Sequence, residues 1–107
     1  SILNLPPTSL TATAISSTQI ELSWIEPNGT VTGYKIEREC PTGDGFEVLV
    51  EDTGSTDTVY IDEGLEPDTE CNYQVFAIND SGISDASNEV SATTDADTSD
   101  TITFTAS

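Results

Sequence analysis

The sequence predicts an all-β fold, a sandwich of seven short antiparallel strands, and three observations support that prediction. Apolar and polar side chains alternate along several runs, which is typical of strands with one buried and one solvated face. Clusters of glycine, proline, asparagine, aspartate and serine separate the runs at intervals of about ten residues. No stretch shows the periodicity of an amphipathic helix. The 107 residues suffice for one such domain.

The first three strands are predicted at residues 8–14, 18–25 and 31–40. Each alternates with a period of two, so that one set of side chains turns toward the core and the other toward water. The turn clusters "EPNGT" and "PTGDG" follow the second and third strands. The residues that share one face are Leu10, Ala12 and Ala14 in the first strand, Ile20, Leu22 and Trp24 in the second, and Tyr34, Ile36, Arg38 and Cys40 in the third.

Four further strands are predicted at 45–51, 57–62, 70–79 and 87–94. They are separated by the turn clusters "DTGSTD", "DEGLEPD" and "NDSGISD". The strand at 70–79 has the clearest alternation, with Cys71, Tyr73, Val75 and Ala77 on one face. The residues expected at the centre of the core are Trp24, Tyr34, Ile36, Tyr73 and Val75.

Residues 6–94 resemble the fibronectin type III family. The resemblance rests on "PPTSLTATAIS", on the tryptophan of "ELSW", on "GYKIER", on "YIDEGLEPDTECNYQVFAIN" and on "SGISDASNEVSATT". It implies an immunoglobulin-like sandwich with sheets A-B-E and C′-C-F-G. Within this family, the sequence most resembles the acidic tandem-repeat modules of microbial surface proteins. The residues that match the family pattern L-x-P-x-T-x-Y-x-x-x-V-x-A-x-N are Leu65, Pro67, Thr69, Val75, Ala77 and Asn79.

Cys71 departs from that pattern, because the family has a corner tyrosine at this position. The register of strands C and F in the family would set Cys40 opposite Cys71 on the core-facing side. Directly opposed residues lie within the distance that a disulfide accepts. The resemblance therefore implies a Cys40–Cys71 bridge in place of the tyrosine, and an oxidising compartment. The alternative is two free buried thiols.

Two sequons, Asn28-Gly29-Thr30 and Asn79-Asp80-Ser81, fall in the predicted B–C and F–G loops. These loops lie at one end of such a sandwich, so glycans on Asn28 and Asn79 would project from the surface. Such glycans would also mask the loops that many modules of this family use for binding. The alternative for Asn28-Gly29 is ordinary turn chemistry.

The run "DADTSD" places Asp95, Asp97 and Asp100 at the alternating positions of a calcium loop. It lacks the glycine and the distal glutamate of an EF-hand, so a solvated acidic linker is the competing interpretation. Asp80 and Asp85 flank a weaker candidate of the same kind. No other cofactor is expected.

Composition excludes several classes of function. A net charge of -18 repels phosphate backbones and anionic membranes, so nucleic-acid binding and membrane insertion are not expected. No apolar run approaches the roughly 20 residues of a membrane span. The chain has no histidine and no recognisable nucleophile–base pair, which argues against an enzyme and against zinc.

The predicted domain, 6–94, is flanked by a short extension at 1–5 and by a tail at 95–107. Ile102 and Phe104 alternate with threonines, which is a strand pattern with no partner inside the domain. Either both ends are linkers, or they pair with the sheet edge of a neighbouring copy. The residues that would make the second kind of contact are Ile2, Leu3, Leu5, Ile102 and Phe104.

These observations favour a non-catalytic structural module of the cell exterior, either a repeat of a surface protein or a subunit of an extracellular filament. Its partners would be neighbouring repeats or other copies of the chain. One alternative is an adhesion module that binds ligands through the B–C and F–G loops. The other is a spacer module of a secreted hydrolase.

Overall fold

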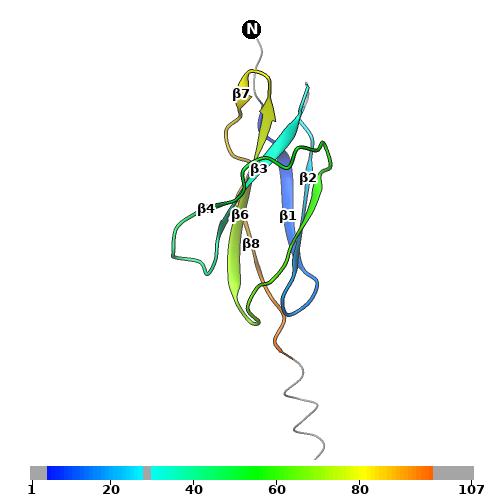
Figure 1. The fold of residues 1–107 in the computed structure, drawn as a ribbon. Coiled ribbons are helices and arrows are strands. Elements are labelled where there is room, and N and C mark those ends of the chain that lie inside the picture. Colours follow the sequence, from blue (N-terminus) through cyan, green and yellow to red (C-terminus); the bar gives the residue numbers. More distant parts are fainter. Residues whose placement is uncertain (1–4, 28–29, 98–107) are drawn as a thin grey trace, which may run out of the picture.

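The protein forms two antiparallel sheets packed face to face, as the computed structural model of residues 5–27 and 30–97 shows (Figure 1). One sheet has the order β1-β2-β5; the other has the order β4-β3-β6, and both β7 and β8 pair with β6. These sheets confirm the predicted A-B-E and C′-C-F-G arrangement. The strands are β1 (Thr8–Ala14), β2 (Ile20–Ile25), β3 (Gly33–Glu39), β4 (Glu47–Val50), β5 (Val59–Asp62), β6 (Glu70–Asn79), β7 (Gly82–Ile83) and β8 (Val90–Thr93).

The described residues form eight strands rather than seven, because the last strand of the sandwich is divided. The predicted strand at 87–94 is β8 alone, and β7 pairs with the far end of β6. Between them, the Ser84 and Ser87 amides still donate to carbonyls of β6, at 2.9 and 2.8 Å. Their hydroxyls accept the amides of Ala77 and Val75, at 2.9 and 3.0 Å. Serine hydroxyls thus replace the strand's own carbonyls, which interrupts the strand without leaving β6 unsatisfied.

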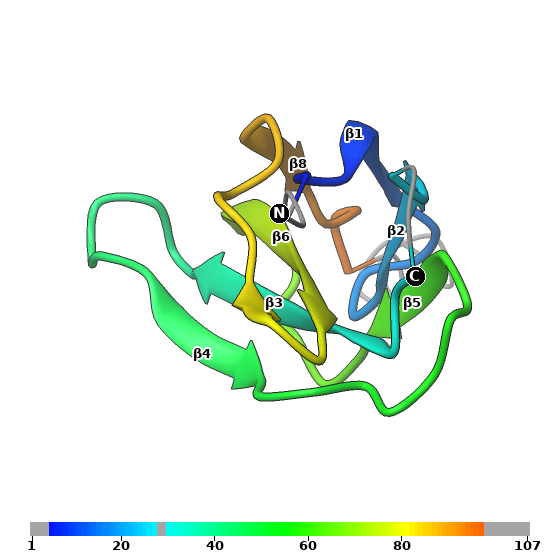
Figure 2. The same cartoon turned by 90° about the horizontal axis from the view of Figure 1, so that it is seen from above.

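The side chain of Asn88 helps to join the two sheets along one edge. The Asn88 side chain accepts the Leu10 amide at 2.9 Å and donates to the Leu10 carbonyl at 3.0 Å. It therefore gives β1 the two hydrogen bonds that a neighbouring strand would supply. At the opposite edge, Figure 2 shows the segment between β4 and β5 crossing from one sheet to the other.

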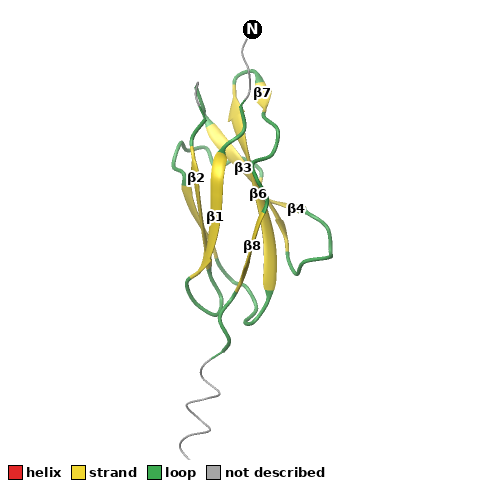
Figure 3. Cartoon of the chain, turned by 180° about the vertical axis from the view of Figure 1, so that it is seen from behind, coloured by secondary structure: helices red, strands yellow, loops and turns green. Residues whose placement is uncertain are grey.

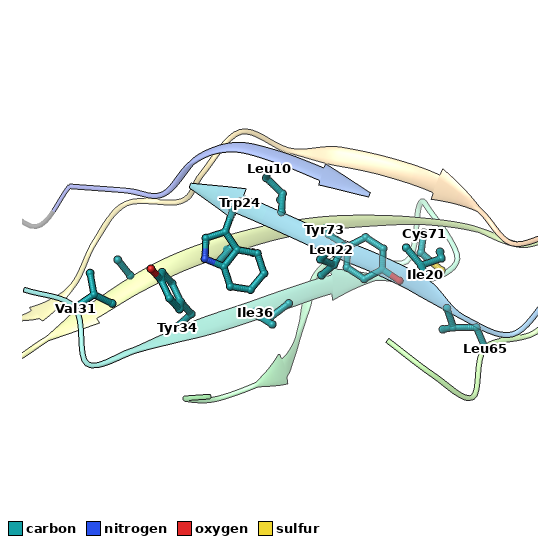
Figure 4. Packing of buried hydrophobic residues seen from close by; sticks show 12 residues of the cluster. Leu10, Ile20, Leu22, Trp24, Val31, Tyr34, Ile36, Leu65, Cys71 and Tyr73 are labelled. Atoms are coloured by element: carbon teal, nitrogen blue, oxygen red, sulfur yellow. The ribbon is translucent and has the colours of Figure 1, made fainter. Parts of the chain in front are cut away.

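The core contains the five residues that the sequence placed at its centre. Trp24, Tyr34, Ile36, Tyr73 and Val75 are all buried. The rings of Trp24 and Tyr34 meet edge to face, with centroids 5.0 Å apart (Figure 4). The Trp24 Nε1 and Tyr34 hydroxyl are buried without a hydrogen-bond partner among the described residues.

The register between β3 and β6 is the one that the family resemblance implied. Tyr34 lies opposite Ala77, and Arg38 lies opposite Tyr73. Just beyond β3, Cys40 forms a disulfide with the buried Cys71, and their Cα atoms are 4.4 Å apart.

A threonine supplies a hydrogen bond in the corner where the family tyrosine is missing. The buried Thr94 hydroxyl donates to the Glu66 carbonyl at 2.7 Å and accepts the Thr69 amide at 2.9 Å. This ties the segment between β5 and β6 to the residue that follows β8. The disulfide of Cys71 and the hydrogen bonds of Thr94 thus both lie in this corner of the sandwich.

Reduction of the disulfide should lower the free energy of unfolding by about 3–4 kcal/mol, because the denatured chain then regains the freedom of a loop closed across 31 residues. The measurement is urea unfolding with and without reductant. A Cys40→Ala/Cys71→Ala variant is the control and should not respond to reductant. Two alkylated cysteines in native, unreduced protein would contradict the bridge.

Candidate interaction surfaces and a buried polar clasp

One of the two predicted glycosylation sites can be placed. Asn79 ends β6 and pairs with Gly82 across a tight turn whose two central residues, Asp80 and Ser81, are exposed. The Asn79 side-chain oxygen accepts the Ser81 amide at 2.7 Å. The F–G loop is therefore a short turn, held in part by the hydrogen bond between Asn79 and Ser81 of the sequon. Asn28 lies outside the described residues.

The structure gives no support to the calcium prediction within the residues that it describes. Asp95 is exposed and takes part in the fold through its backbone: its amide donates to the Ser16 carbonyl, and its carbonyl accepts the Asp68 amide. Asp97 is also exposed, and Asp100 falls outside the described residues. Across 5–27 and 30–97, no group of three or more acidic or sulfur side chains is arranged to hold a metal ion.

Of the five residues predicted to contact a neighbouring copy, the structure describes one. Leu5 is half exposed and lines a shallow groove with Pro6, Ile25 and Pro27. The other four, Ile2, Leu3, Ile102 and Phe104, lie outside the described residues.

A buried polar cluster, which we call the clasp, connects the two sheets. It consists of Arg38 on β3, Asp62 on β5 and Tyr73 on β6. Arg38 Nη1 donates to both Asp62 carboxylate oxygens, at 2.9 and 3.0 Å. The Tyr73 hydroxyl donates to Asp62 Oδ2 at 2.6 Å. Asp62 and Tyr73 are buried, whereas the Arg38 side chain is 31% exposed, so water reaches one end of the clasp.

On β5, Tyr60 and Asp62 are the residues that face the core. Asp62 points into the core, so Val59 and Ile61, which have the opposite parity, point outward. A slip of one residue would bury both aliphatic side chains, as the hydrophobic effect favours. It would also turn Tyr60, which packs against the core, outward and would take Asp62 away from Arg38. The register therefore keeps Tyr60 and Asp62 inside and leaves the two aliphatic residues outside.

Sequence reasoning missed the clasp, although one signal was available. Arg38 was placed on the same face as Tyr34 and Ile36, and a cation with that orientation requires a buried acid. The predicted strand 57–62 ends in such an acid, Asp62.

The clasp also affects the ionisation of Tyr73. Burial is the main reason that the pKa of Tyr73 lies well above its usual range, and the hydrogen bond to Asp62 and the charge of Asp62 raise it further. Arg38 acts in the opposite direction. The pKa of Tyr34 is also raised, mainly by burial.

On the outer face of the larger sheet, polar side chains of β3 and β6 form hydrogen bonds with one another. Glu37 accepts the Gln74 amide and Glu39 accepts the Asn72 amide, both at 2.7 Å. The Asn72 amide and the backbone N–H of Gly45 lower the pKa of Glu39. The three cross-strand pairs of this polar ladder are Lys35 with Phe76, Glu37 with Gln74, and Glu39 with Asn72.

The outer face of the smaller sheet is different, and we call it the aliphatic face. Figure 3 shows its strands β1 and β2 from the side opposite to Figure 1. Strands β1, β2 and β5 together contain two carboxylates, Glu21 and Asp62. Since Asp62 points inward, Glu21 is the one that faces out. The aliphatic face consists of Thr11, Thr13, Glu21, Ser23, Ile25, Val59 and Ile61.

Comparison with known proteins decides the family. The model of the fibronectin type III domain matches residues 5–93. The chain belongs to the fibronectin type III family. Human usherin is 33% identical over 86 residues, covering 67% of this chain, and the mouse netrin receptor DCC is 31% identical over 94 residues, covering 83%. The chain spans 2% and 6% of those two proteins, so it corresponds to one module of each.

Solved fibronectin type III structures agree with this assignment. The domain of human fibronectin type III domain containing protein 3 is 31% identical, with a TM-score of 0.73 and 92% of each chain covered. The FN5 domain of Drosophila Lar is 31% identical, with a TM-score of 0.71, covering 89% of this chain and all of that one. No helix in the described residues is long and apolar enough to cross a membrane.

Replacement of Arg38 by methionine should lower the free energy of unfolding by about 2–4 kcal/mol, because Asp62 would lose the cation that balances its charge. Arg38→Met/Asp62→Leu should recover most of the loss, since no charge then remains buried. Lys35→Met is the matched control: it breaks the half-buried pair of the chain's other cation with Glu37, which keeps its hydrogen bond from Gln74, and should change stability by less than about 1 kcal/mol. Equal losses for Arg38→Met and Lys35→Met in urea unfolding would contradict the clasp.

Stability should fall at alkaline pH. The pKa of Tyr73 is higher in the folded than in the unfolded chain, so its contribution is fully present below the unfolded pKa of about 10 and is lost as pH rises above it. In a Tyr34→Phe/Tyr60→Phe variant, Tyr73 is the single tyrosine. Its phenolate absorbance should appear together with unfolding followed by circular dichroism. Ionisation of Tyr73 near pH 10 in a folded chain would contradict this assignment.

Proposed function

We propose that this chain is a non-catalytic structural module of the cell exterior, a repeat of a surface protein or a subunit of an extracellular filament. The observation that carries the proposal is the placement of the two ends. Leu5 precedes β1 at the pole where Thr8 pairs with Ile25, whereas Asp95 is bonded to Ser16 at the other pole (Figure 1). Modules with opposed ends can follow one another along an axis without rearrangement.

The relatives support the general class and the compartment. Usherin and the netrin receptor DCC contain such a module as a small fraction of a long chain, which fits a structural or adhesive role outside the cell. The disulfide fits the same oxidising compartment. Origin in an acidic tandem-repeat protein of a microbe is a further proposal, supported by the charge of -18 and not by these animal relatives.

A catalytic role has no support in the chain. The sequence has no histidine, and the buried carboxylate of the described core, Asp62, is engaged in the clasp. Fibronectin type III domains are in general non-catalytic modules. The spacer role in a secreted hydrolase remains compatible with all of this, and the parent reading frame would separate it from a repeat or a filament subunit.

The proposed partner is another copy or repeat of the chain, reached through the ends. Ile102 and Phe104 would dock on an adjacent copy, together with the segment that contains Ile2, Leu3 and Leu5. Glycans on Asn28 and Asn79, and calcium at Asp95, Asp97 and Asp100, are separate proposals that would modify the surface around these ends. The adhesive alternative depends on the B–C and F–G loops, of which the F–G loop exposes only the turn at Asp80 and Ser81 in the described structure.

Replacement of Ile102 and Phe104 by serine in the full chain should weaken end-to-end association, because both apolar contacts are lost while the charge is unchanged. The measurement is sedimentation in saline buffer, with electron microscopy, in the presence and absence of calcium. Thr103→Ser/Thr105→Ser is the matched control in the same segment and should behave as the unaltered chain. Equal association by the altered and unaltered chains would reduce the tail to a linker.

A further inference from the structure

The two cysteines of the disulfide lie in different surroundings. Cys71 is fully buried within the core cluster, whereas Cys40 follows β3 and packs against that cluster from its edge, where it is half-buried. Cys40 also lines a cavity of about 70 Å³, together with Arg38, Leu49 and residues of the turn between β3 and β4. A reagent that enters this cavity therefore meets Cys40 and not Cys71.

The cavity is small and its rim is acidic. It is larger than the ~30 Å³ that a water molecule occupies in the liquid, so the sulfur and first carbon of a small thiol fit there. Asp44 and Glu47 line it and are exposed. Arg38 is the one cation among its lining residues, and its charge is already balanced by Asp62. The entrance is therefore negative, and the net charge of -18 extends the same sign over the molecule.

We propose that Cys40 is a thiol-exchange site, at which a small thiol without a further negative charge forms a mixed disulfide while the chain stays folded. The thiolate of the reagent attacks Cys40 Sγ, and a new S–S bond forms there. The bond to Cys71 breaks, its electron pair leaves with Cys71 Sγ, and that sulfur takes a proton from the solvent. One disulfide replaces another, so the step consumes no oxidant. It does not depend on how copies of the chain associate.

The burial of Cys71 makes the step slow and its product lasting. A thiolate is unfavourable in apolar surroundings, so Cys71 is a poor leaving group. The same burial keeps the released Cys71 thiol neutral, and a neutral thiol is a poor nucleophile that does not quickly displace the reagent. Each cysteine lies two residues from a member of the cross-strand pair Arg38 and Tyr73, so the exchange removes the covalent link between β3 and β6 beside the clasp.

The test is treatment of the native full chain with cysteamine, mercaptoethanol or mercaptoethanesulfonate, followed by acid quenching, alkylation of free thiols and peptide mass spectrometry. The reagent should be found on Cys40 and the alkyl group on Cys71, while circular dichroism shows a folded chain. Per thiolate, cysteamine should react about tenfold faster than mercaptoethanesulfonate at low salt. The rates should converge as NaCl rises from about 0.01 to about 1 M.

The rim is tested by Asp44→Asn/Glu47→Gln, which should speed the reaction of mercaptoethanesulfonate several-fold at low salt. Asp80→Asn/Asp85→Asn is the matched control, because it removes the same charge beyond the other end of β6. It should change the rate much less. Equal acceleration by both variants overturns the cavity as the point of entry. A reagent found on Cys71, or a rate independent of thiol concentration, overturns the exchange at Cys40, because the chain must then open first.

Discussion

The Asp62 carboxylate accepts hydrogen bonds from Arg38 and Tyr73, which belong to the opposite sheet, and much of the sandwich depends on that contact. A buried carboxylate without a partner is costly, so the three residues must fold together or not at all. Ion pairs of this kind add little stability compared with apolar packing. They also act on register: β5 pairs with β2 in the orientation that keeps Asp62 with Arg38 and Tyr60 against the core.

That constraint links the interior to the surface. The orientation that keeps Asp62 with Arg38 leaves Val59 and Ile61 facing water, opposite Ser23 and Glu21 of β2. On the other sheet, β3 and β6 bury Tyr34, Ile36, Tyr73 and Val75 and project the polar ladder, in which the Lys35 ammonium lies over the Phe76 ring. The exposure of Val59 and Ile61 thus accompanies the inward orientation of Tyr60 and Asp62.

Much of the fold could be predicted because periodicity and turn chemistry carry it. Strand β6 shows strict alternation, and its register with β3 followed from the family pattern, which also placed Cys40 opposite Cys71. The division of the last strand could not be predicted, because it depends on serine hydroxyls that replace backbone carbonyls at particular positions. The clasp was missed because its members are distant in sequence and Arg38 was treated only as part of a pattern. The sequence shows that the tyrosine is missing but does not show the hydrogen bonds of Thr94, since a threonine at the end of a strand carries no special signal.

The most direct test of this account is the orientation of β5 in solution, measured by nuclear Overhauser effects in isotope-labelled protein. The Ile61 and Val59 methyl groups should show cross-peaks to Glu21 and Ser23 on the outer face of β2, and the Tyr73 ring should show cross-peaks to the Asp62 methylene. Cross-peaks from either pair of methyl groups to Leu22 or to the Tyr73 ring would mean that β5 is turned the other way. The clasp would then not set the register, and the aliphatic face would not exist.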